Sequence, residues 1–130
     1  MRRLSLLGAL LPTVIAAGAF GALAQGAVKG DPSSGATLFE DRCVMCHVAA
    51  GGGQGPSLTG VIGRKAASAA GFHYSLALKA SGITWTAAEL NRFLSGPAKA
   101  VPGTAMAAVI ADPRQRADLI AYLESRGGRP

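Results

Sequence analysis

The chain places both of its cysteines and one of its two histidines in a single stretch, Cys-Val-Met-Cys-His, at residues 43–47. A disulfide between Cys43 and Cys46 would close a very small loop and restrict the unfolded chain little. A redox-active dithiol would leave His47 without a role. Structural zinc needs four ligands, and it fits poorly because the chain has no second Cys pair and offers only His73 besides this stretch. The spacing instead favours covalent haem attachment, with thioethers from both cysteines and His47 as an iron ligand.

The first 24 residues differ in composition from the rest of the chain. Arg2 and Arg3 precede an uncharged run over residues 4–24 that ends in Ala-Leu-Ala, the layout of a secretory signal peptide. An uncleaved membrane anchor is the alternative, because a run of this length could span a bilayer. Its internal Gly and Pro residues and the small-residue site favour cleavage. We therefore predict a signal peptide at residues 1–24, export to the periplasm, and one domain at residues 25–130.

The charge balance argues against a nucleic-acid partner. Without the two leader arginines, 11 Lys and Arg face 7 Asp and Glu, a net charge of +4. Basic residues never run longer than two, and aromatic residues are few, so the surface would at most attract acidic protein partners weakly. A small, Gly-rich domain of this kind usually needs a disulfide, a metal or a large apolar cofactor to complete its core.

A histidine-ligated haem iron needs a sixth ligand, and methionine sulfur suits electron transfer. Met106 follows a Pro-Gly turn in the segment VPGTAM, which is typical of a constrained loop. Met45 lies inside the attachment stretch, on the same side as His47, and is expected to be a packing or exposed side chain. His73 is a rival ligand, although a single histidine in a Gly-bounded loop more often faces solvent.

Capping signals predict an all-helical fold with long loops. Asp-Pro pairs at residues 31–32 and 112–113 are typical helix starts, and a capping box of Thr86 and Glu89 predicts a third helix. Gly96-Pro97 should end that helix, and no strand-like alternation is sustained. Helices are expected from residue 31 to Cys43, over 75–81, from 86 to 96, and from 112 to 127. Loops this long are unusual unless a cofactor fills the space between them.

Five segments together resemble class I c-type cytochromes, particularly the mitochondrial cytochrome c and bacterial cytochrome c2 group. They are GATLFEDRCVMCH, GPSLTGVIGRK, AGFHYSLALKASGITW, FLSGPAKAVPGTAM and RADLIAYL. The resemblance implies the all-α cytochrome c fold, with about four to five short helices and long loops around one covalently bound haem c. It also implies an electron carrier rather than an enzyme, with Cys43 and Cys46 in thioethers and His47 and Met106 as axial ligands.

The resemblance assigns further roles around the haem. The Pro56 carbonyl would accept a hydrogen bond from the second ring nitrogen of His47. Tyr74 and Trp85 would hydrogen-bond one haem propionate, with Arg64 near it, and Thr104 would reach the other. Gly35, Phe39, Leu119 and Tyr122 would form the contact between the first and last helices, where a side chain at residue 35 would clash with the Tyr122 ring.

Two departures from the family pattern concern the haem pocket and the docking face. Phe93 and Leu78 stand where the family often has tyrosine and asparagine, and both changes remove polar groups from the pocket. A drier pocket would raise the reduction potential, whereas loss of a hydrogen bond to the Met sulfur would lower it. Arg42 and Lys99 occupy positions where mitochondrial members carry docking lysines, with Lys65 further round. Since few other basic residues occur there, we expect weaker steering and a more apolar contact.

These observations predict a monomeric, mobile carrier in the periplasm. Its partners would be redox proteins, such as a membrane oxidase, a bc1-type complex, a reaction centre or a periplasmic dehydrogenase. One alternative is a haem electron-entry subunit of a membrane-bound or dehydrogenase complex. Another is a ligand-binding haem protein in which Met106 leaves the iron easily, although no second acid–base group beyond His73 supports it.

Overall fold

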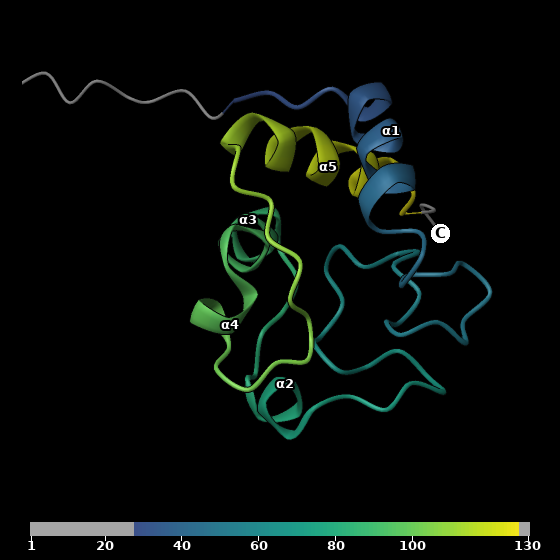
Figure 1. The fold of residues 1–130 in the computed structure, drawn as a ribbon, viewed down its shortest axis with the longest axis vertical. Coiled ribbons are helices and arrows are strands. Elements are labelled where there is room, and N and C mark those ends of the chain that lie inside the picture. Colours follow the sequence, from purple (N-terminus) through teal and green to yellow (C-terminus); the bar gives the residue numbers. More distant parts are fainter. Residues whose placement is uncertain (1–27, 128–130) are drawn as a thin grey trace, which may run out of the picture.

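The computed structural model describes residues 28–127, and the predicted leader at residues 1–24 lies outside this range. The described residues form five helices and no sheet: α1 (Pro32–Arg42), α2 (Leu76–Ala80), α3 (Ala87–Ser95), α4 (Pro97–Ala100) and α5 (Pro113–Ser125) (Figure 1). The only strand-like pairing in this part of the chain is an isolated bridge between Lys65 and Thr84. The all-α prediction is confirmed. Within residues 28–127 no helix has the length and apolar character needed to cross a bilayer.

Helices α1 and α5 pack directly against each other and form one side of the molecule (Figure 1). Asp31 caps α1 by accepting hydrogen bonds from the Ser33 and Ser34 amides, and its own amide donates to Asp118 Oδ1 at 2.7 Å. Gly35 permits the close approach, because a Cβ there would lie 2.6 Å from the Asp118 carbonyl carbon and 2.8 Å from Tyr122 Cβ. The obstacle is therefore the α5 backbone and the base of the Tyr122 side chain, rather than its ring.

Helix α3 begins as predicted, but only half of the capping box forms. Thr86 Oγ1 accepts a hydrogen bond from the Glu89 amide at 3.2 Å. The Glu89 carboxylate pairs with Arg92 at 2.7 Å, while the Thr86 amide donates to the Thr84 carbonyl at 2.8 Å. Since the Thr86 amide already has a partner, Glu89 is free to pair along its own helix.

Helix α4 was missed by the sequence analysis. Gly96 ends α3 as expected, but Pro97 then occupies the first position of a new short helix instead of opening a loop. Proline suits this position because its fixed φ is compatible with a helix and its missing N–H needs no partner there. The Arg92 guanidinium donates to the Ala100 carbonyl at 3.1 Å, which satisfies the C-terminal end of α4.

Helix α2 lies against the loop that leads to Met106. Gly103 has φ +91°, and a Cβ placed on it would lie 3.1 Å from Ala77 Cβ. Nearby, the buried Trp85 and Phe93 rings meet edge to face, with centroids 5.1 Å apart. The long loop region at residues 43–75 runs from α1 to α2 and forms the side of the molecule opposite α3 and α4 (Figure 1).

Candidate functional site

The attachment stretch forms a hydrogen-bonded turn directly after α1. The Cys43 amide donates to the Phe39 carbonyl at 2.8 Å, and the His47 amide donates to the Cys43 carbonyl at 2.8 Å. Both cysteines are half-buried and carry free thiols, so the disulfide alternative is not realised in this structure. Burial raises the pKa of the Cys43 thiol, and the adjacent Arg42 charge opposes this only in part. Both sulfurs therefore remain available for bonds to a cofactor.

The His47 ring is oriented from both an edge and a face. Its Nδ1 lies 2.8 Å from the Pro56 carbonyl oxygen, which can only accept, so Nδ1 donates this hydrogen bond, and in the neutral ring Nε2 then keeps its lone pair. Gly55 packs against the ring, since a Cβ there would lie 2.7 Å from Nδ1 and 3.0 Å from Nε2. The sequence analysis did not single out Gly55. In the sequence it was only the last glycine of a Gly-rich run and the first residue of the matching segment GPSLTGVIGRK, with no role attached to it.

Arg64 contacts the segment that follows Pro56. Its guanidinium donates to the Ser57 carbonyl at 2.9 Å and to the Thr59 carbonyl at 3.1 Å. The resemblance predicted Arg64 near a haem propionate, and it did not indicate these two loop contacts. The Arg64 carbonyl in turn accepts a hydrogen bond from the Trp85 amide at 2.9 Å. Arg64 thus links the His47 loop to a buried part of the core.

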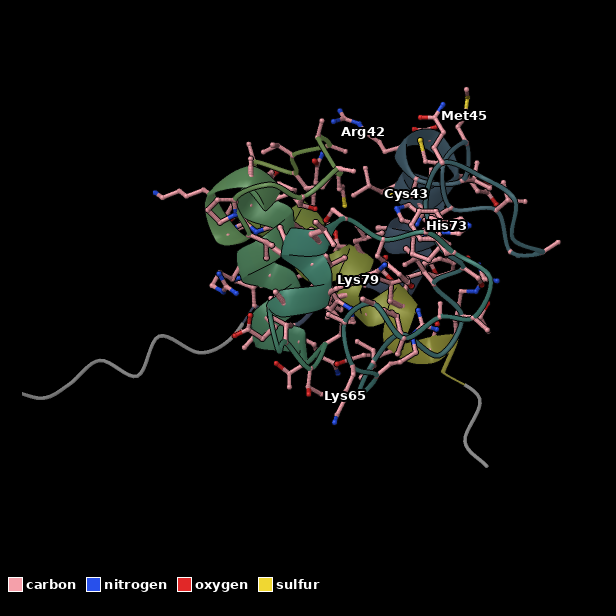
Figure 2. The ribbon with its side chains drawn as sticks, turned by 90° about the horizontal axis from the view of Figure 1, so that it is seen from below. Arg42, Cys43, Met45, Lys65, His73 and Lys79 are labelled. Carbon is pink, nitrogen blue, oxygen red and sulfur yellow. The ribbon has the colours of Figure 1, made fainter. Side chains whose placement is uncertain are left out.

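Met106 lies half-buried in the loop after α4 and packs against the hydrophobic core. Its amide donates to Thr104 Oγ1 at 3.4 Å, and the Thr104 amide donates to the Val101 carbonyl at 3.0 Å. Met45 is 85 % exposed and points away from the protein beside Arg42 and Cys43 (Figure 2). Of the two expectations for Met45, packing or exposure, the structure shows exposure, and His73 is exposed as well.

The comparisons with known proteins agree with this arrangement. The family described as Cytochrome c matches residues 32–127. The chain is 45 % identical over 102 residues to cytochrome c of Chlamydomonas reinhardtii, covering 75 % of this chain and 91 % of that protein. It is 45 % identical over 102 residues to cytochrome c2 of Rhodopila globiformis, covering 76 % and 96 %. The solved structure of cytochrome cH from Methylobacterium extorquens matches with a TM-score of 0.70 and 45 % identity, over 74 % of this chain and 99 % of that one.

The chain belongs to the cytochrome c family. The resemblance inferred from the sequence and the predicted fold are both confirmed. Members of this family carry electrons and are not enzymes, so this cytochrome c is an electron carrier that works with redox protein partners. Its cofactor is covalently attached haem c, for which Cys43 and Cys46 supply the cysteine pair.

The residues of this cytochrome c fit a haem in both donor chemistry and apolar surface. Two free thiols, one imidazole nitrogen and one thioether are the groups that a bis-ligated haem c requires. Several apolar side chains from separate loops and helices pack against the core yet stay only half-buried, a surface that a large flat cofactor would cover. They are Leu38, Leu58, Ile62, Leu78, Ile83 and Met106.

The remaining predicted residues occupy two separate regions of the cytochrome c structure. Trp85 is 8 % exposed, and the half-buried Tyr74 stacks edge-on against Phe72 and accepts a hydrogen bond from the Ala69 amide at 3.2 Å. The docking candidates are both exposed, Arg42 in the last turn of α1 and Lys99 in α4.

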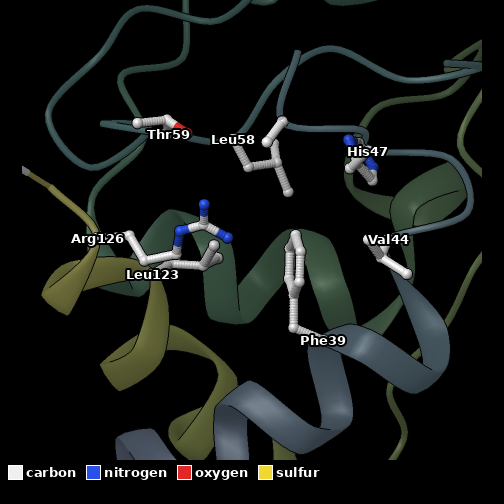
Figure 3. A pocket seen from close by; sticks show the side chains of 8 residues that line it. Phe39, Val44, His47, Leu58, Thr59, Leu123 and Arg126 are labelled. Atoms are coloured by element: carbon white, nitrogen blue, oxygen red, sulfur yellow. The ribbon is translucent and has the colours of Figure 1, made fainter. Parts of the chain in front are cut away.

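A small cavity of about 40 Å³ lies beside His47, between α1, α5 and the loop that carries Leu58 and Thr59 (Figure 3). Its walls include Phe39 from α1 and Leu123 from α5. This volume admits about one or two water molecules and is far too small for a cofactor. Among residues 28–127, no group of three or more His, Cys, Asp or Glu side chains is placed to hold a separate metal ion.

Proposed function

We propose that this cytochrome c holds its haem through thioethers at Cys43 and Cys46 and through axial bonds from His47 and Met106. The hydrogen bond of 2.8 Å between His47 Nδ1 and the Pro56 carbonyl carries this proposal. It favours a proton on Nδ1, which supports Nε2 of this imidazole, directly after the cysteine pair, as the ligand atom. When bound, the haem supplies a one-electron ferric/ferrous couple.

Exposure and loop structure support Met106 as the sixth ligand. Met106 is half-buried in a hydrogen-bonded loop, whereas Met45 is 85 % exposed in the attachment turn and His73 is exposed. Phe93, which is buried, and Leu78, which packs against the same core as Met106, would keep water from the thioether. Two tight protein ligands leave no position for a substrate, as an electron carrier requires.

Four further residues complete the proposed surroundings of the haem. Tyr74 and Trp85 would donate hydrogen bonds to one propionate, and the positive charge of Arg64 would offset it. Thr104 would reach the other propionate, since its oxygen already accepts from the Met106 amide and its O–H is still able to donate. These roles follow the family resemblance, and the burial of Trp85 supports them.

We further propose that removal of residues 1–24 accompanies export to the periplasm, where the protein acts as a monomeric carrier. Its partners would be a membrane oxidase, a bc1-type complex, a reaction centre or a periplasmic dehydrogenase, and not nucleic acid. Arg42 and Lys99 would meet acidic groups on these proteins. From Arg42 to Ala88 the chain has no Asp or Glu but four Lys and Arg residues, Arg42 included, which supports docking through the region around Arg42.

The test compares absorption spectra of the matured wild type, Met106→Ala and Met45→Ala, with and without dithionite. The wild type should contain covalent low-spin haem and show the weak long-wavelength ferric band of methionine ligation. Met106→Ala should lose this band, and the matched control Met45→Ala should keep it. A high-spin wild type, or a band that survives Met106→Ala, would exclude the ligand assignment and favour a ligand-binding haem protein. Absence of covalent haem would exclude the thioethers.

A further inference from the structure

We propose that Arg64 is a positioning residue for His47. Its guanidinium holds the loop that presents the Pro56 carbonyl, and the carbonyl in turn holds the imidazole. The inference rests on the proposed function in one respect, namely that His47 is an iron ligand. It differs from the role that the resemblance predicted for Arg64, which is to offset the charge of a haem propionate.

The two hydrogen bonds of Arg64 fall on the residues next to the critical carbonyl. Ser57 follows Pro56 directly, and its carbonyl oxygen lies 2.9 Å from Arg64 Nη2. The Thr59 carbonyl oxygen lies 3.1 Å from Nη1. The guanidinium therefore spans residues 57–59 from end to end, and it fixes the peptide units that determine where the Pro56 carbonyl points.

Arg64 can hold this loop because its own backbone is firmly anchored. Its carbonyl accepts from the Trp85 amide, and the neighbouring Gly63 amide donates to the Trp85 carbonyl, both at 2.9 Å. Trp85 is buried and packs on Phe93 of α3. In contrast, the chain between His47 and Gly55 contains three consecutive glycines and is mostly exposed, so it offers little support to the loop. The rigidity of the core thus reaches the Pro56 carbonyl through the Arg64 side chain, in addition to the packing of Leu58 against the core.

The geometry requires the shape of arginine and not only its charge. A planar guanidinium donates to two carbonyl oxygens from two different nitrogens, whereas a lysine ammonium is a single point charge. The Arg64 guanidinium donates to two backbone carbonyls, neither of which is charged. Among residues 28–127 the structure shows one ion pair, between Arg92 and Glu89, and Arg64 takes no part in it. The substitution Arg64→Lys therefore separates the two roles, since it keeps the positive charge and removes the two-pronged contact.

The two roles also predict opposite changes in the reduction potential. A hydrogen bond at Nδ1 strengthens electron donation by the imidazole, which favours the ferric state. If Arg64 positions His47, Arg64→Lys loosens the loop, weakens this hydrogen bond and raises the potential. If Arg64 acts only as a charge, Arg64→Lys leaves the potential unchanged, and Arg64→Gln lowers it because a nearby positive charge disfavours ferric haem.

The experiment uses the haem-loaded wild type, Arg64→Lys, Arg64→Gln and the control Arg92→Lys, which also loses an arginine contact to a carbonyl, at α4. Hydrogen exchange of the His47 Nδ1 proton is followed by NMR in the reduced protein, and the potential is measured on the same samples. We expect exchange in Arg64→Lys to be at least about tenfold faster, as for loss of one hydrogen bond to a charged group, with a raised potential. Arg92→Lys should match the wild type in exchange; its potential is not compared, because the Arg92 contact to the Ala100 carbonyl lies at the start of the Met106 loop.

If Arg64→Lys shows the same His47 Nδ1 exchange rate and the same reduction potential as the wild type, the proposal is overturned, whatever the result for Arg64→Gln. Faster exchange in Arg92→Lys as well would also overturn it, because the effect would then be general loosening. The His47 ring signals of the reduced wild type show separately whether the imidazole ligates iron. If it does not, the proposed ligand set fails, yet the exchange rate still tests whether Arg64 holds the His47–Pro56 contact.

Discussion

The two proposed iron ligands are held in different ways. The imidazole of His47 is held at the ring itself, by the Pro56 carbonyl at one edge and by the Gly55 backbone at one face. These contacts come from residues within nine positions along the chain. The Arg64 contacts to residues 57 and 59, together with the packing of Leu58, connect this unit to the rest of the core.

The thioether of Met106 is held indirectly, through both ends of its loop. Before the loop, Arg92 of α3 donates to the Ala100 carbonyl at 3.1 Å. After it, Arg116 of α5 donates to the Ile110 carbonyl at 2.8 Å and the Ala111 carbonyl at 2.7 Å. Next to Met106, the hydrogen bond from its amide to Thr104 is long, at 3.4 Å.

This difference indicates which side of the site yields first. A ligand held by its own neighbours stays in place as long as a short stretch of chain keeps its shape. A ligand held by loop ends is lost when any one of three helices shifts, because local openings begin where contacts are few. We therefore expect the Met106 side to open while the His47 side remains intact, and each prediction below tests one part of this comparison.

The largest effect is expected from Gly55→Ala, which disturbs the His47 side directly. The added Cβ would lie 2.7 Å from His47 Nδ1, and the ring cannot retreat without losing the Pro56 carbonyl. We expect the free energy of unfolding to fall by about 3 kcal/mol, the upper range for overpacking. Urea unfolding of the haem-loaded protein measures this.

Gly96→Ala is the control for that prediction, because a Cβ at Gly96 meets only Lys99 Cβ, at an ordinary 3.6 Å. Equal stability losses in the two variants would show that the contact between Gly55 and His47 is not tight. The contrast between the two sides of the site would then lose its strongest support.

A smaller effect is expected from Arg116→Gln, which releases the far end of the Met106 loop. Arg116 also bonds Asn91 Oδ1 of α3 at 2.7 Å, so its guanidinium joins two helices to the segment 110–111. We expect a stability loss of about 1.5 kcal/mol. Exogenous imidazole should also bind the ferric protein several-fold faster, because it must first displace Met106 from the iron.

The control for Arg116→Gln is Arg114→Gln, an exposed position on the same helix. Stopped-flow mixing with imidazole compares the two variants with the wild type. Unchanged imidazole kinetics in Arg116→Gln would contradict the indirect anchoring of Met106, even if the protein is less stable.

The parts of the fold that could be predicted from the sequence are those fixed by contacts between residues close together in the chain. Starts of α1, α3 and α5 were predicted correctly because Asp31, Thr86 and Asp112 each bond amides two or three residues away. Helix α4 was missed because the pair Gly96-Pro97 is compatible both with the end of one helix and with the start of another. Which of these occurs depends on how the segment packs against the rest of the protein. The half-formed capping box has a similar cause, since Glu89 had two possible partners and the nearby Arg92 competed successfully.

The site shows the same limit. The two cysteines and the two proposed ligands could be named from spacing and from the family resemblance, because these signals are local in sequence. Gly55 could not be distinguished from the other glycines of its run, since its special property is contact with an imidazole eight residues earlier. The hydrogen-bond partners of Arg64 could not be predicted either, because they are backbone carbonyls, which every residue type carries.

The smallest effect is expected at Asp31, whose contacts stabilise a framework that both sides of the site share. Asp31 caps α1, which carries the attachment turn, and its amide bonds Asp118 of α5, the helix that anchors the Met106 loop. The Ser34 hydroxyl, followed by the Ser33 and Ser34 amides, holds the pKa of the Asp31 carboxyl below its ordinary value of 3.8. A lowered native pKa means that the ionised carboxylate adds stability above pH 3.8, and that this contribution disappears as the pH falls through the native value.

Asp31→Asn keeps a capping oxygen but cannot titrate, so it should remove this contribution at neutral pH and none at low pH. The difference in urea midpoint between wild type and Asp31→Asn should therefore be small and positive at pH 6, and it should shrink steadily between pH 4 and pH 2. The imidazole kinetics and the His47 exchange rate should stay at wild-type values at pH 6, because the framework supports both ligands equally. A selective change in one of them would mean that α1 favours one side of the site, and the two modes of anchoring would then be less independent than their contacts indicate.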